Sequence, residues 1–246
     1  MALDKETINR LGSLSIVVPT YNEAENIREL IERTEVSLKG LDFEIIVVDD
    51  SSPDGTAEIA EELGKAHGNV KVVKRPKKMG LASAVLEGVK AARHDFVAVM
   101  DADLQHPPEL LPKLLEKARE GYDVVIASRY IEGGGVEGWG FWRKLISKGA
   151  ILLAHMLFPK ARAVKDPMSG FFLFKRDVVK DIKLELLGYK LLLEVLVRGR
   201  YDKVAEIPYV FRKREKGESK LGLREIFDYV VLLLKLRMGD ERVGLA

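Results

Sequence analysis

The sequence predicts an α/β domain with a mainly parallel, doubly wound sheet that carries helices on both faces. Three observations lead to this prediction. Short apolar runs alternate with segments of helical periodicity through the first half of the chain, as in βαβ units. Hydrophobic residues make up 47% of the 246 residues, which allows a substantial core and excludes a disordered chain. Cysteine is absent, which excludes a disulfide scaffold, a thiolate metal site and a cysteine nucleophile.

The first half of the chain is expected to hold five strands with four helices between them. Asn22 and Glu25 have the spacing of a capping box, which should open a helix that runs to Leu38. Proline at 107 and 108 suits the first turn of the fourth helix. The expected strands are 14–19, 43–48, 70–73, 96–100 and 123–127, and the remaining helices are one that begins near Thr56 and one over 81–92.

The pattern changes after Arg129. Residues 132–138 include four glycines and are expected to form a loop, and 166–170 reads as a turn. Apolar helices are expected over 139–158 and 221–236, with further strands at 171–174 and 205–211. No linker, internal repeat or low-complexity tract interrupts the chain, so a single domain over residues 1–246 is expected.

Charge and apolar runs limit the partners of the chain. The 40 basic and 38 acidic residues leave a net charge of +2, so the protein is not expected to coat nucleic acid. The N-terminus lacks the apolar core of a signal peptide, and no apolar run approaches the roughly 18 residues needed to cross a bilayer. The few amide side chains and the many Lys and Glu residues favour a thermophilic origin.

Chemically distinctive residues follow four of the expected strands. Ligands of open α/β sheets bind beyond the carboxyl ends of the strands, so four such clusters predict a site at that edge. One cluster alone would mean little, because aspartates cap helices routinely. The clusters are Pro19-Thr-Tyr-Asn-Glu23, Asp49-Asp50, Asp101-Ala-Asp-Leu-Gln-His106 and Ser128-Arg-Tyr130.

The third cluster suggests a metal site. Asp101 and Asp103 lie two residues apart at a strand end, and Gln105 adds an amide oxygen. Such hard oxygen ligands suit Mg²⁺ or Mn²⁺, which completes its shell with water and substrate phosphates. The alternative is that both aspartates only cap the following helix, and the spacing leaves both interpretations open.

Phosphate binding must rely on a metal and on cations. The chain has neither a P-loop nor a G-x-G-x-x-G motif after the first strand. The segment 212–220 is basic at both ends and is either a lid over a diphosphate or an exposed loop. The candidate cations, each of which has a solvated surface charge as its alternative, are Arg129, Arg143, Arg214, Lys216 and Lys220.

Six motifs together resemble the family 2 glycosyltransferases, in order from Leu14 to about Leu236. Two runs, Asp101-Ala-Asp-Leu-Gln-His-Pro-Pro108 and Arg143-Lys-Leu-Ile-Ser-Lys-Gly149, are similar more specifically to the branch of the family that uses polyprenyl phosphates. The six motifs are Val17-Val-Pro-Thr-Tyr-Asn-Glu23, Val47-Val-Asp-Asp-Ser51, Met100-Asp-Ala-Asp-Leu-Gln-His106, Ala127-Ser-Arg-Tyr130, Asp166-Pro-Met-Ser-Gly-Phe171 and Gly217-Glu-Ser-Lys220.

The resemblance implies a GT-A fold, which is a Rossmann-like sheet flanked by helices with added C-terminal strands and interface helices. It also implies transfer of mannose from GDP-mannose to dolichyl or another polyprenyl phosphate, with inversion and with Mg²⁺ or Mn²⁺. Residues 14–130 would form the nucleotide-sugar half and 131–236 the acceptor half.

The family's roles can be carried over residue by residue. Asp103 and Gln105, with Asp101, would bind the metal, and the order in which Asp50 and Asp101 contact ribose and base stays open. The catalytic residues would be Asp103, Arg129, Arg214 and Lys220. The implied contacts are Pro19, Tyr21, Glu23, Val48 and Asp50 for the nucleoside, Asp101, Ala102 and Asp103 for the nucleotide, and Arg129, Arg143, Arg214 and Lys220 for the phosphates.

A phosphate acceptor changes what the catalyst must supply. A phosphate monoester has its second pKa near ~6 and is already an anionic nucleophile, so no general base is required. Asp166 has the position of a base in other branches of the family. Its place before Pro167 is more typical of a structural turn aspartate, which is the role we expect.

The lipid acceptor implies attachment to a membrane surface, at the cytoplasmic face and without a transmembrane segment. The two candidate segments, 139–158 and 229–237, combine apolar and basic residues as interfacial helices do, whereas burial in a core is their ordinary alternative. Some relatives carry transmembrane helices after the catalytic domain. A compact form, a separate membrane-anchoring subunit and a truncated chain therefore all remain open.

Four other functions fit parts of the pattern. The nearest is transfer of glucose from UDP-glucose to a polyprenyl phosphate. A polysaccharide or protein acceptor is disfavoured by the lack of a clear base. A receiver-like phospho-acceptor module would share the acidic strand end at Asp49-Asp50 but not the second one at 101–105. A non-catalytic membrane adaptor would bind lipid regardless of nucleotide and metal.

Overall fold

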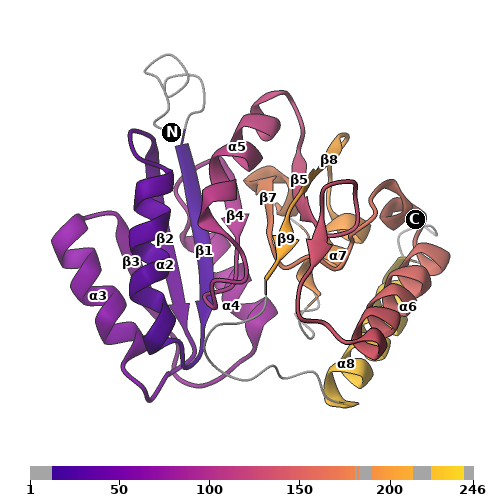
Figure 1. Ribbon diagram of the computed structural model, residues 1–246, viewed down its shortest axis with the longest axis horizontal. Helices are drawn as coiled ribbons and strands as arrows, with labels where there is room; N and C mark the ends of the chain where they lie inside the picture. Colours follow the sequence, from indigo (N-terminus) through magenta and orange to yellow (C-terminus); the bar gives the residue numbers. More distant parts are fainter. Residues whose placement is uncertain (1–12, 181, 183–189, 213–222, 241–246) are drawn as a thin grey trace.

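The computed structural model describes residues 13–180, 182, 190–212 and 223–240, although the side chains of 223–226 and 239–240 lie outside that description (Figure 1). Arg214, Lys216 and Lys220, which the sequence analysis selected, lie outside the described residues.

The described residues form a central sheet of seven strands in the order β3-β2-β1-β4-β7-β5-β8. β1 pairs in parallel with β2 and β4, and β5 pairs in parallel with β8. β7 is antiparallel to both of its neighbours, β4 and β5. The strands are β1 Ser13–Thr20, β2 Asp42–Asp49, β3 Val70–Lys74, β4 Phe96–Val99, β5 Val124–Ser128, β7 Phe172–Lys175 and β8 Val204–Pro208. The predicted mainly parallel α/β sheet is therefore confirmed.

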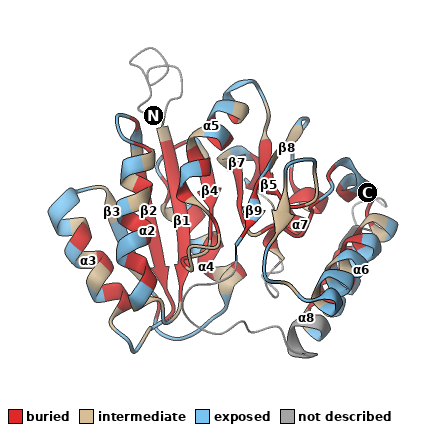
Figure 2. Ribbon diagram, viewed as in Figure 1, coloured by how far each residue is buried: buried red, intermediate tan, exposed pale blue. Residues whose placement is uncertain are grey.

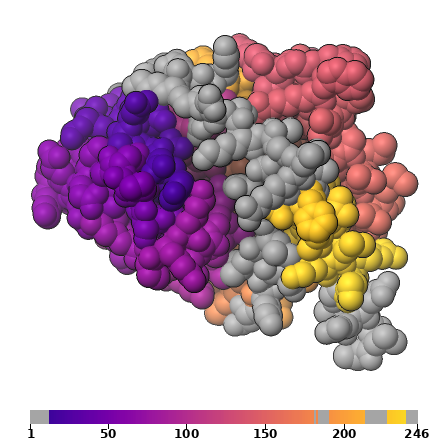
Figure 3. Space-filling view, turned by 90° about the horizontal axis from the view of Figure 1, so that it is seen from below, coloured from indigo at the N-terminus to yellow at the C-terminus, as the bar shows by residue number. Residues whose placement is uncertain are grey.

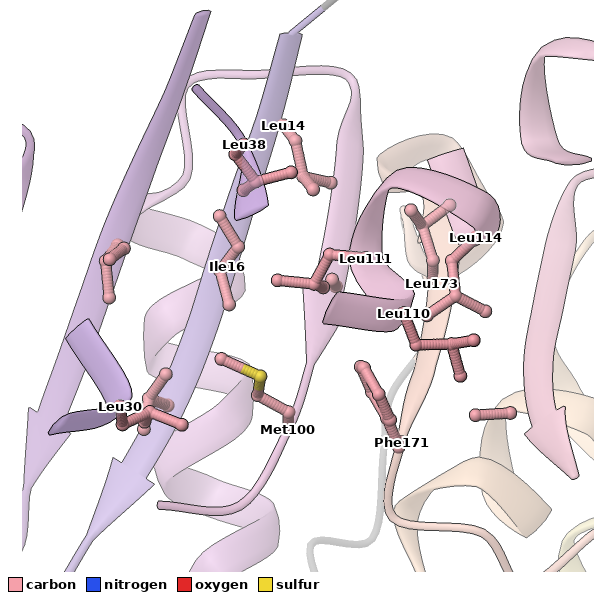
Figure 4. Close-up of a cluster of buried hydrophobic side chains, with 14 of the residues drawn as sticks. Leu14, Ile16, Leu30, Leu38, Met100, Leu110, Leu111, Leu114, Phe171 and Leu173 are labelled. Atoms are coloured by element: carbon pink, nitrogen blue, oxygen red, sulfur yellow. The ribbon is translucent and has the colours of Figure 1, made fainter. Parts of the chain in front are cut away.

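Helices cover both faces of the sheet, and each face has its own apolar core. α2 (Ala24–Ser37), α3 (Thr56–His67) and α5 (Leu111–Arg119) cover one face, while α4 (Leu81–Ala91) and α7 (Leu191–Arg198) cover the other. Figure 2 shows the buried strands between these helices, and Figure 4 shows the first core, where Leu30, Ile16 and Leu111 from α2, β1 and α5 converge.

A third cluster joins α6 (Phe141–Leu157) and α8 (Leu223–Asp240) to the rest of the molecule. Leu193 of α7 packs with Ala154 of α6 and Leu232 of α8. The hydroxyl of Tyr229 donates a hydrogen bond of 2.6 Å to the carbonyl oxygen of Ala150, which ties the two helices together. The two helices lie side by side at one end of the molecule (Figure 1).

The predicted capping box is wrong. α2 begins at Ala24, and its N-cap is Glu23, because Asn22 has a left-handed backbone with φ of 60°. The donors at the start of the helix are satisfied from the loop after β2 instead. The amide of Ala24 donates to Oδ2 of Asp54 at 3.0 Å, and the amide of Glu23 donates to Oγ1 of Thr56 at 2.9 Å.

The second half of the chain departs from the expected elements in three places. The expected loop at 132–138 contains a short strand, β6 (Gly135–Val136), which pairs in parallel with β9 (Val210–Phe211). The expected strand 205–211 is split into β8 and β9 at Tyr209, whose amide donates to the carbonyl oxygen of Ser128. α7 was not expected, because six of its eight residues are apolar and a short run of this kind is equally typical of a buried strand.

Candidate active site

The four polar clusters lie at the carboxyl ends of β1, β2, β4 and β5, which all run in the same direction. Thr20, the last residue of β1, is in register with Asp49, the last residue of β2. In Figure 1 these strands run downward, and Figure 3 views the molecule from that side. The N-terminal half and the α6–α8 pair occupy opposite flanks of this view. The predicted site at the carboxyl edge therefore has the expected location.

Three non-glycine residues with left-handed backbone lie at this edge. Asn22, Ser51 and Leu104 have φ of 60°, 56° and 60°, and each follows a different strand, β1, β2 and β4. Such conformations cost roughly 1–3 kcal/mol each and cluster at functional sites, where the surrounding structure enforces them. Their coincidence at one sheet edge supports the assignment of this edge as the site.

Asp50 lies in a buried ion pair with Arg75, the residue that follows β3. The second carboxylate oxygen of Asp50 accepts the backbone amides of Met79 and Gly80 at 3.1 and 3.0 Å. Arg75 is only 3% exposed, and sequence reasoning did not select it. A buried arginine needs a carboxylate partner, but nothing in its local sequence indicates that the partner is Asp50.

The other nucleoside residues of the prediction lie at or just after the ends of β1 and β2. Pro19 and Val48 are buried at the ends of β1 and β2. Glu23 accepts a hydrogen bond of 2.7 Å from the side-chain amide of Asn26. The ammonium nitrogen of Lys78 lies 3.7 Å from the centroid of the Tyr21 ring, in a cation–π contact.

His106 organises the Asp101–Asp103 turn. The backbone amide of Asp101 donates to Nδ1 of His106 at 3.0 Å, which assigns the proton of the neutral ring to Nε2. The ring stacks on Phe171 with centroids 5.3 Å apart, and Gly170 leaves the space that a β-carbon would fill 3.0 Å from it. Burial lowers the pKa of His106 from 6.5 to about 4, so the ring is neutral near pH 7.

Asp101, Asp103 and Gln105 have the chemistry of a magnesium or manganese site. The backbone amide of Gln105 donates to Oδ1 of Asp103 at 3.1 Å, and its side-chain nitrogen donates to the carbonyl oxygen of Arg212 at 2.7 Å. That orientation leaves the amide oxygen of Gln105 as its metal-ligating atom. Within the described ranges, no group of three or more His, Cys, Asp or Glu side chains could hold a metal. The donor set thus fits an ion that substrate phosphates and water complete.

Arg129 and Asp166 form a buried bidentate ion pair. Nε and Nη2 of Arg129 each donate to a different oxygen of Asp166 at 2.8 Å, and the backbone amide of Arg129 donates to Oδ2 at 3.0 Å. Asp166 is fully buried and Arg129 is 8% exposed. The hydrogen bonds to Asp166 raise the pKa of Arg129 against the opposing effect of burial. The pair fixes the end of β5 to the turn before β7.

A second arginine and a lysine lie near this pair. The guanidinium carbons of Arg143 and Arg129 lie 4.3 and 5.6 Å from the ring centroid of Trp139, so one indole contacts both cations. Lys190, at the start of α7, interacts electrostatically with Arg129 and with Asp166, and sequence reasoning missed it. Burial and then Arg129 lower the pKa of Lys190 to about 8.

A model of a known protein family matches this chain. The family model described as Glycosyl transferase family 2 matches residues 15–183, which is more than half of the chain. The chain belongs to glycosyltransferase family 2. The family resemblance seen in the motifs is therefore confirmed.

Relatives within family 2 cover most of the chain. A dolichol-phosphate mannosyltransferase of Pyrococcus furiosus is 51% identical over 94% of this chain, but the match spans only 65% of that protein's length. The dolichol-phosphate mannosyltransferase of Saccharomyces cerevisiae is 36% identical over 90% of this chain and 86% of its own length. The protein of the same name from Mycosarcoma maydis is 36% identical over 91% of this chain and 79% of its own length.

Solved structures support the family 2 fold. The glucosyl-3-phosphoglycerate synthase of Mycobacterium tuberculosis, solved with Mn²⁺ and UDP-glucose, has a TM-score of 0.68 at 22% identity and covers 96% of this chain and 82% of its own. The mannosyl-3-phosphoglycerate synthase of Rubrobacter xylanophilus has the same score and identity, with 96% and 79% coverage. The expected GT-A type fold is confirmed. None of the helices in the part of the chain described is long and apolar enough to span a membrane.

Proposed function

We propose that this protein transfers mannose from GDP-mannose to dolichyl or another polyprenyl phosphate. The observation that carries the proposal is the 51% identity to the Pyrococcus furiosus dolichol-phosphate mannosyltransferase over nearly the whole chain. The motifs that follow β1, β2, β4 and β5 also lie along one edge of the sheet. The donor would use residues 14–130, and the acceptor would use 131–236.

On the donor side, the residues after β1 and β2 hold the nucleoside. Tyr21 offers an aromatic face on which a base can stack. Asp50 fixes the loop after β3 by accepting the amides of Met79 and Gly80. A direct contact of Asp50 with the base would have to share a carboxylate that Arg75 and two backbone amides already occupy. Asp50 is therefore better suited to positioning the base site than to reading the base.

A divalent ion, Mg²⁺ or Mn²⁺, would be held by Asp101, Asp103 and the amide oxygen of Gln105. Such an ion supplies charge stabilisation for a departing diphosphate, worth several kcal/mol. His106 contributes by fixing the backbone of Asp101, and the left-handed Leu104 turns the chain between the ligands. The Mn²⁺ seen with the structural relative from Mycobacterium tuberculosis supports a divalent ion in this fold.

On the acceptor side, Arg129 and Arg143 bring positive charge to the incoming phosphate. Burial and then repulsion by Arg129 lower the pKa of Arg143, and a bound dianion would relieve that repulsion. Asp166 offsets the charge of Arg129, and Asp101 also attracts Lys190, so among the described residues the three cations exceed the carboxylates that act on them by one charge. The phosphate oxygen then attacks the anomeric carbon in line with the diphosphate, which inverts that carbon.

Asp166 has no role as a base in this scheme. Both of its oxygens are engaged by Arg129, and burial keeps it from water. Its backbone amide in turn donates to Oε1 of Glu206 at 2.9 Å, which fixes the turn. A phosphate acceptor, which needs no base, agrees with this arrangement.

A membrane surface is the natural location for such an acceptor. α6 and α8 expose large apolar side chains, including Trp142 at 73%, next to basic residues, as helices that lie in a lipid interface do. We place the protein peripherally at the cytoplasmic face, with a separate membrane-anchoring subunit as an additional partner. The exposed apolar residues of these helices are Phe141, Trp142, Leu145, Ile146, Leu152, Leu153 and Met156 on α6, and Phe227, Val230, Leu234 and Met238 on α8.

The test is transfer of labelled mannose from GDP-mannose into organic-extractable lipid, with dolichyl phosphate, detergent and Mn²⁺. Asp103→Ala should abolish the product, while Asp95→Ala, which removes a side chain 92% exposed away from the site, should leave it unchanged. Lipid product from UDP-glucose and none from GDP-mannose would identify UDP-glucose as the donor in place of GDP-mannose. A fully active Asp103→Ala variant would remove this residue from the metal site.

A further inference from the structure

The loop that connects β3 to α4, residues 75–80, lies beside the proposed nucleoside site, and its side chains other than Arg75 have no role in the function described so far. It contains two adjacent exposed lysines, Lys77 and Lys78. Lys78 alone of the two reaches the ring of Tyr21. The loop is therefore a candidate for contact with the nucleobase.

The loop is held in place from within the protein. Nη1 of Arg75 donates to Oγ of Ser83 at 2.6 Å, and Nη2 donates to the carbonyl oxygen of Gly80 at 2.9 Å. Asp50 pairs with Arg75 and accepts the amides of Met79 and Gly80. Both ends of the loop are thus fixed to the carboxyl end of β2, which sets the position of Lys78 between them.

The contact of Lys78 with Tyr21 occupies a surface that suits a base. The ammonium lies 3.7 Å from the ring centroid, so it covers the face on which a base would stack. An exposed cation–π contact is worth only about 0.5–1 kcal/mol. Stacking of a base on an aromatic side chain is worth about 1–3 kcal/mol, so a base can displace the ammonium from the ring.

We propose that Lys78 determines the preference for guanine, by donating to O6 and N7 of a base that takes its place on Tyr21. This inference rests on the proposed function, since it needs a guanine nucleotide as donor. Guanine presents two acceptors, O6 and N7, along one edge, and a lysine ammonium can donate to both. Adenine presents an amino donor beside N7, which repels an ammonium, and a pyrimidine lacks N7. The carboxylate of Asp50 only accepts hydrogen bonds, so the donor to O6 and N7 must come from another side chain, and Lys78 supplies it.

The test is a binding measurement that does not depend on the acceptor. Isothermal titration calorimetry with Mn²⁺ would compare GDP, IDP, ADP, UDP and 7-deaza-GDP on the full chain. Lys78→Met should lower the affinity for GDP and for IDP by at least about fivefold, which is the lower end of the range for a bidentate contact with a base. The affinities for ADP and UDP should not change. Lys77→Met is the matched control, because Lys77 is its exposed neighbour, and it should keep the affinity of the wild type.

The analogue 7-deaza-GDP sharpens the test, because it lacks only the N7 acceptor. The wild type should bind it more weakly than GDP, whereas Lys78→Met should bind the two equally. If Lys78→Met still distinguishes GDP from 7-deaza-GDP as the wild type does, the inference is wrong. Lys78→Arg, which keeps a donor pair, should retain the preference for GDP over ADP, and loss of that preference would also count against the inference.

Failure of the proposed function gives different results. A wild type that binds UDP and not GDP overturns both the GDP donor and the role of Lys78. If the wild type prefers GDP through Lys78 but transfers no mannose to dolichyl phosphate, the role of Lys78 is supported and dolichyl phosphate is rejected as the acceptor. If Lys78→Met keeps the preference for GDP and transfers mannose normally, the role of Lys78 is rejected and the proposed function is kept.

Discussion

Among single residues, Asp166 has two conceivable roles, general base and structural partner of Arg129, and the two predict different results. A base would have to release one oxygen to the acceptor, whereas both oxygens bind Arg129 in the structure. Removing one partner of a buried ion pair typically costs 3–5 kcal/mol, because the other charge is left buried.

Asp166→Asn should therefore lower the free energy of unfolding by about 3 kcal/mol, as measured by denaturant titration. The double variant Arg129→Met with Asp166→Leu should recover stability, because an apolar pair needs no charge compensation, but it should not recover turnover. Unchanged stability together with lost turnover in Asp166→Asn would instead assign Asp166 as a base.

His106 predicts a pH dependence of stability at the same scale. Its pKa is about 4 in the folded protein against 6.5 in the unfolded chain, so the unfolded chain binds a proton first as the pH falls. Stability is thus complete above pH 6.5 and is lost progressively toward pH 4. The loss from this residue between pH 7 and pH 5 is about 2 kcal/mol.

The measurement is urea unfolding of the metal-free protein at both pH values, with His106→Asn as the control. Oδ1 of asparagine can accept the amide of Asp101, but the side chain does not titrate. The wild type should lose about 2 kcal/mol more than the variant. Arg129 opposes protonation of the ring and Asp103 favours it, and equal losses in both proteins would show that burial does not keep His106 neutral.

Single-residue contacts show where sequence reasoning stops. The clusters at 101–106 and 128–130 were found because parallel strands bring their carboxyl ends to one edge. Arg75 and Lys190 were not found, because each acquires its role from partners far away in the chain, Asp50 in the one case and Arg129 in the other. No local pattern records such pairs.

At the scale of elements, α4 depends on its close approach to the sheet. A β-carbon on Gly88 would lie 2.3 Å from Cγ1 of Val17 and 3.1 Å from Cγ2 of Val48, in the core between α4 and the strands β1 and β2. The glycine therefore serves packing, although it weakens the helix itself.

Gly88→Ala should destabilise the fold by about 1–3 kcal/mol in thermal or urea unfolding, because the helix must move away from the sheet. Gly149→Ala on α6 is the matched control, since its β-carbon would meet no atom within 4 Å. That variant should be neutral or more stable by up to about 1 kcal/mol. Equal effects of both changes would mean that helix propensity, and not packing, governs these positions.

The second prediction at this scale concerns membrane binding by the exposed apolar side chains of α6 and α8. Trp142→Glu with Leu153→Glu should reduce cosedimentation with anionic vesicles by at least tenfold, because two apolar side chains no longer enter the lipid and two negative charges are added.

Val36→Glu on α2 is the control for that experiment, since Val36 is an apolar residue 77% exposed on a helix outside the α6–α8 pair. It should not change vesicle binding. Undiminished binding of the double variant would assign these helices to contact with protein instead.

The elements themselves were largely predictable, and the exceptions have physical causes. Strands β1 to β5 stand out because they are apolar and bounded by turn residues. α7 is only eight residues long and mostly apolar, since it packs against the sheet on one side and against α6 and α8 on the other. β6 and β9 are two residues long and exist only as each other's partners, so neither has a sequence signal.

For the whole molecule, the two halves of the site are joined by a continuous sheet, so ligands at the edge should stabilise the entire fold. GDP with Mn²⁺ at about 100 times the Kd should add about 2.7 kcal/mol, or roughly 5–10 °C in Tm. EDTA should reverse most of the shift, and Asp103→Ala should abolish the part that depends on Mn²⁺.

Differential scanning fluorimetry of the full chain would measure both effects, with Asp95→Ala as the control that keeps the full shift. A shift that is the same with and without EDTA would mean that the nucleotide binds without the ion.

The antiparallel strand β7 also determines the order in which the protein can assemble during synthesis. β2, β3 and β4 can each pair as soon as they leave the ribosome, because one neighbour of each, β1 for β2 and β4 and β2 for β3, has already been made. β5 has neighbours only in β7 and β8, which are translated later, so its edges stay unpaired until Phe172 and the residues after it emerge. The nascent chain thus carries an exposed apolar strand for the interval in which α6 is being made, and this interval is when it most needs a chaperone.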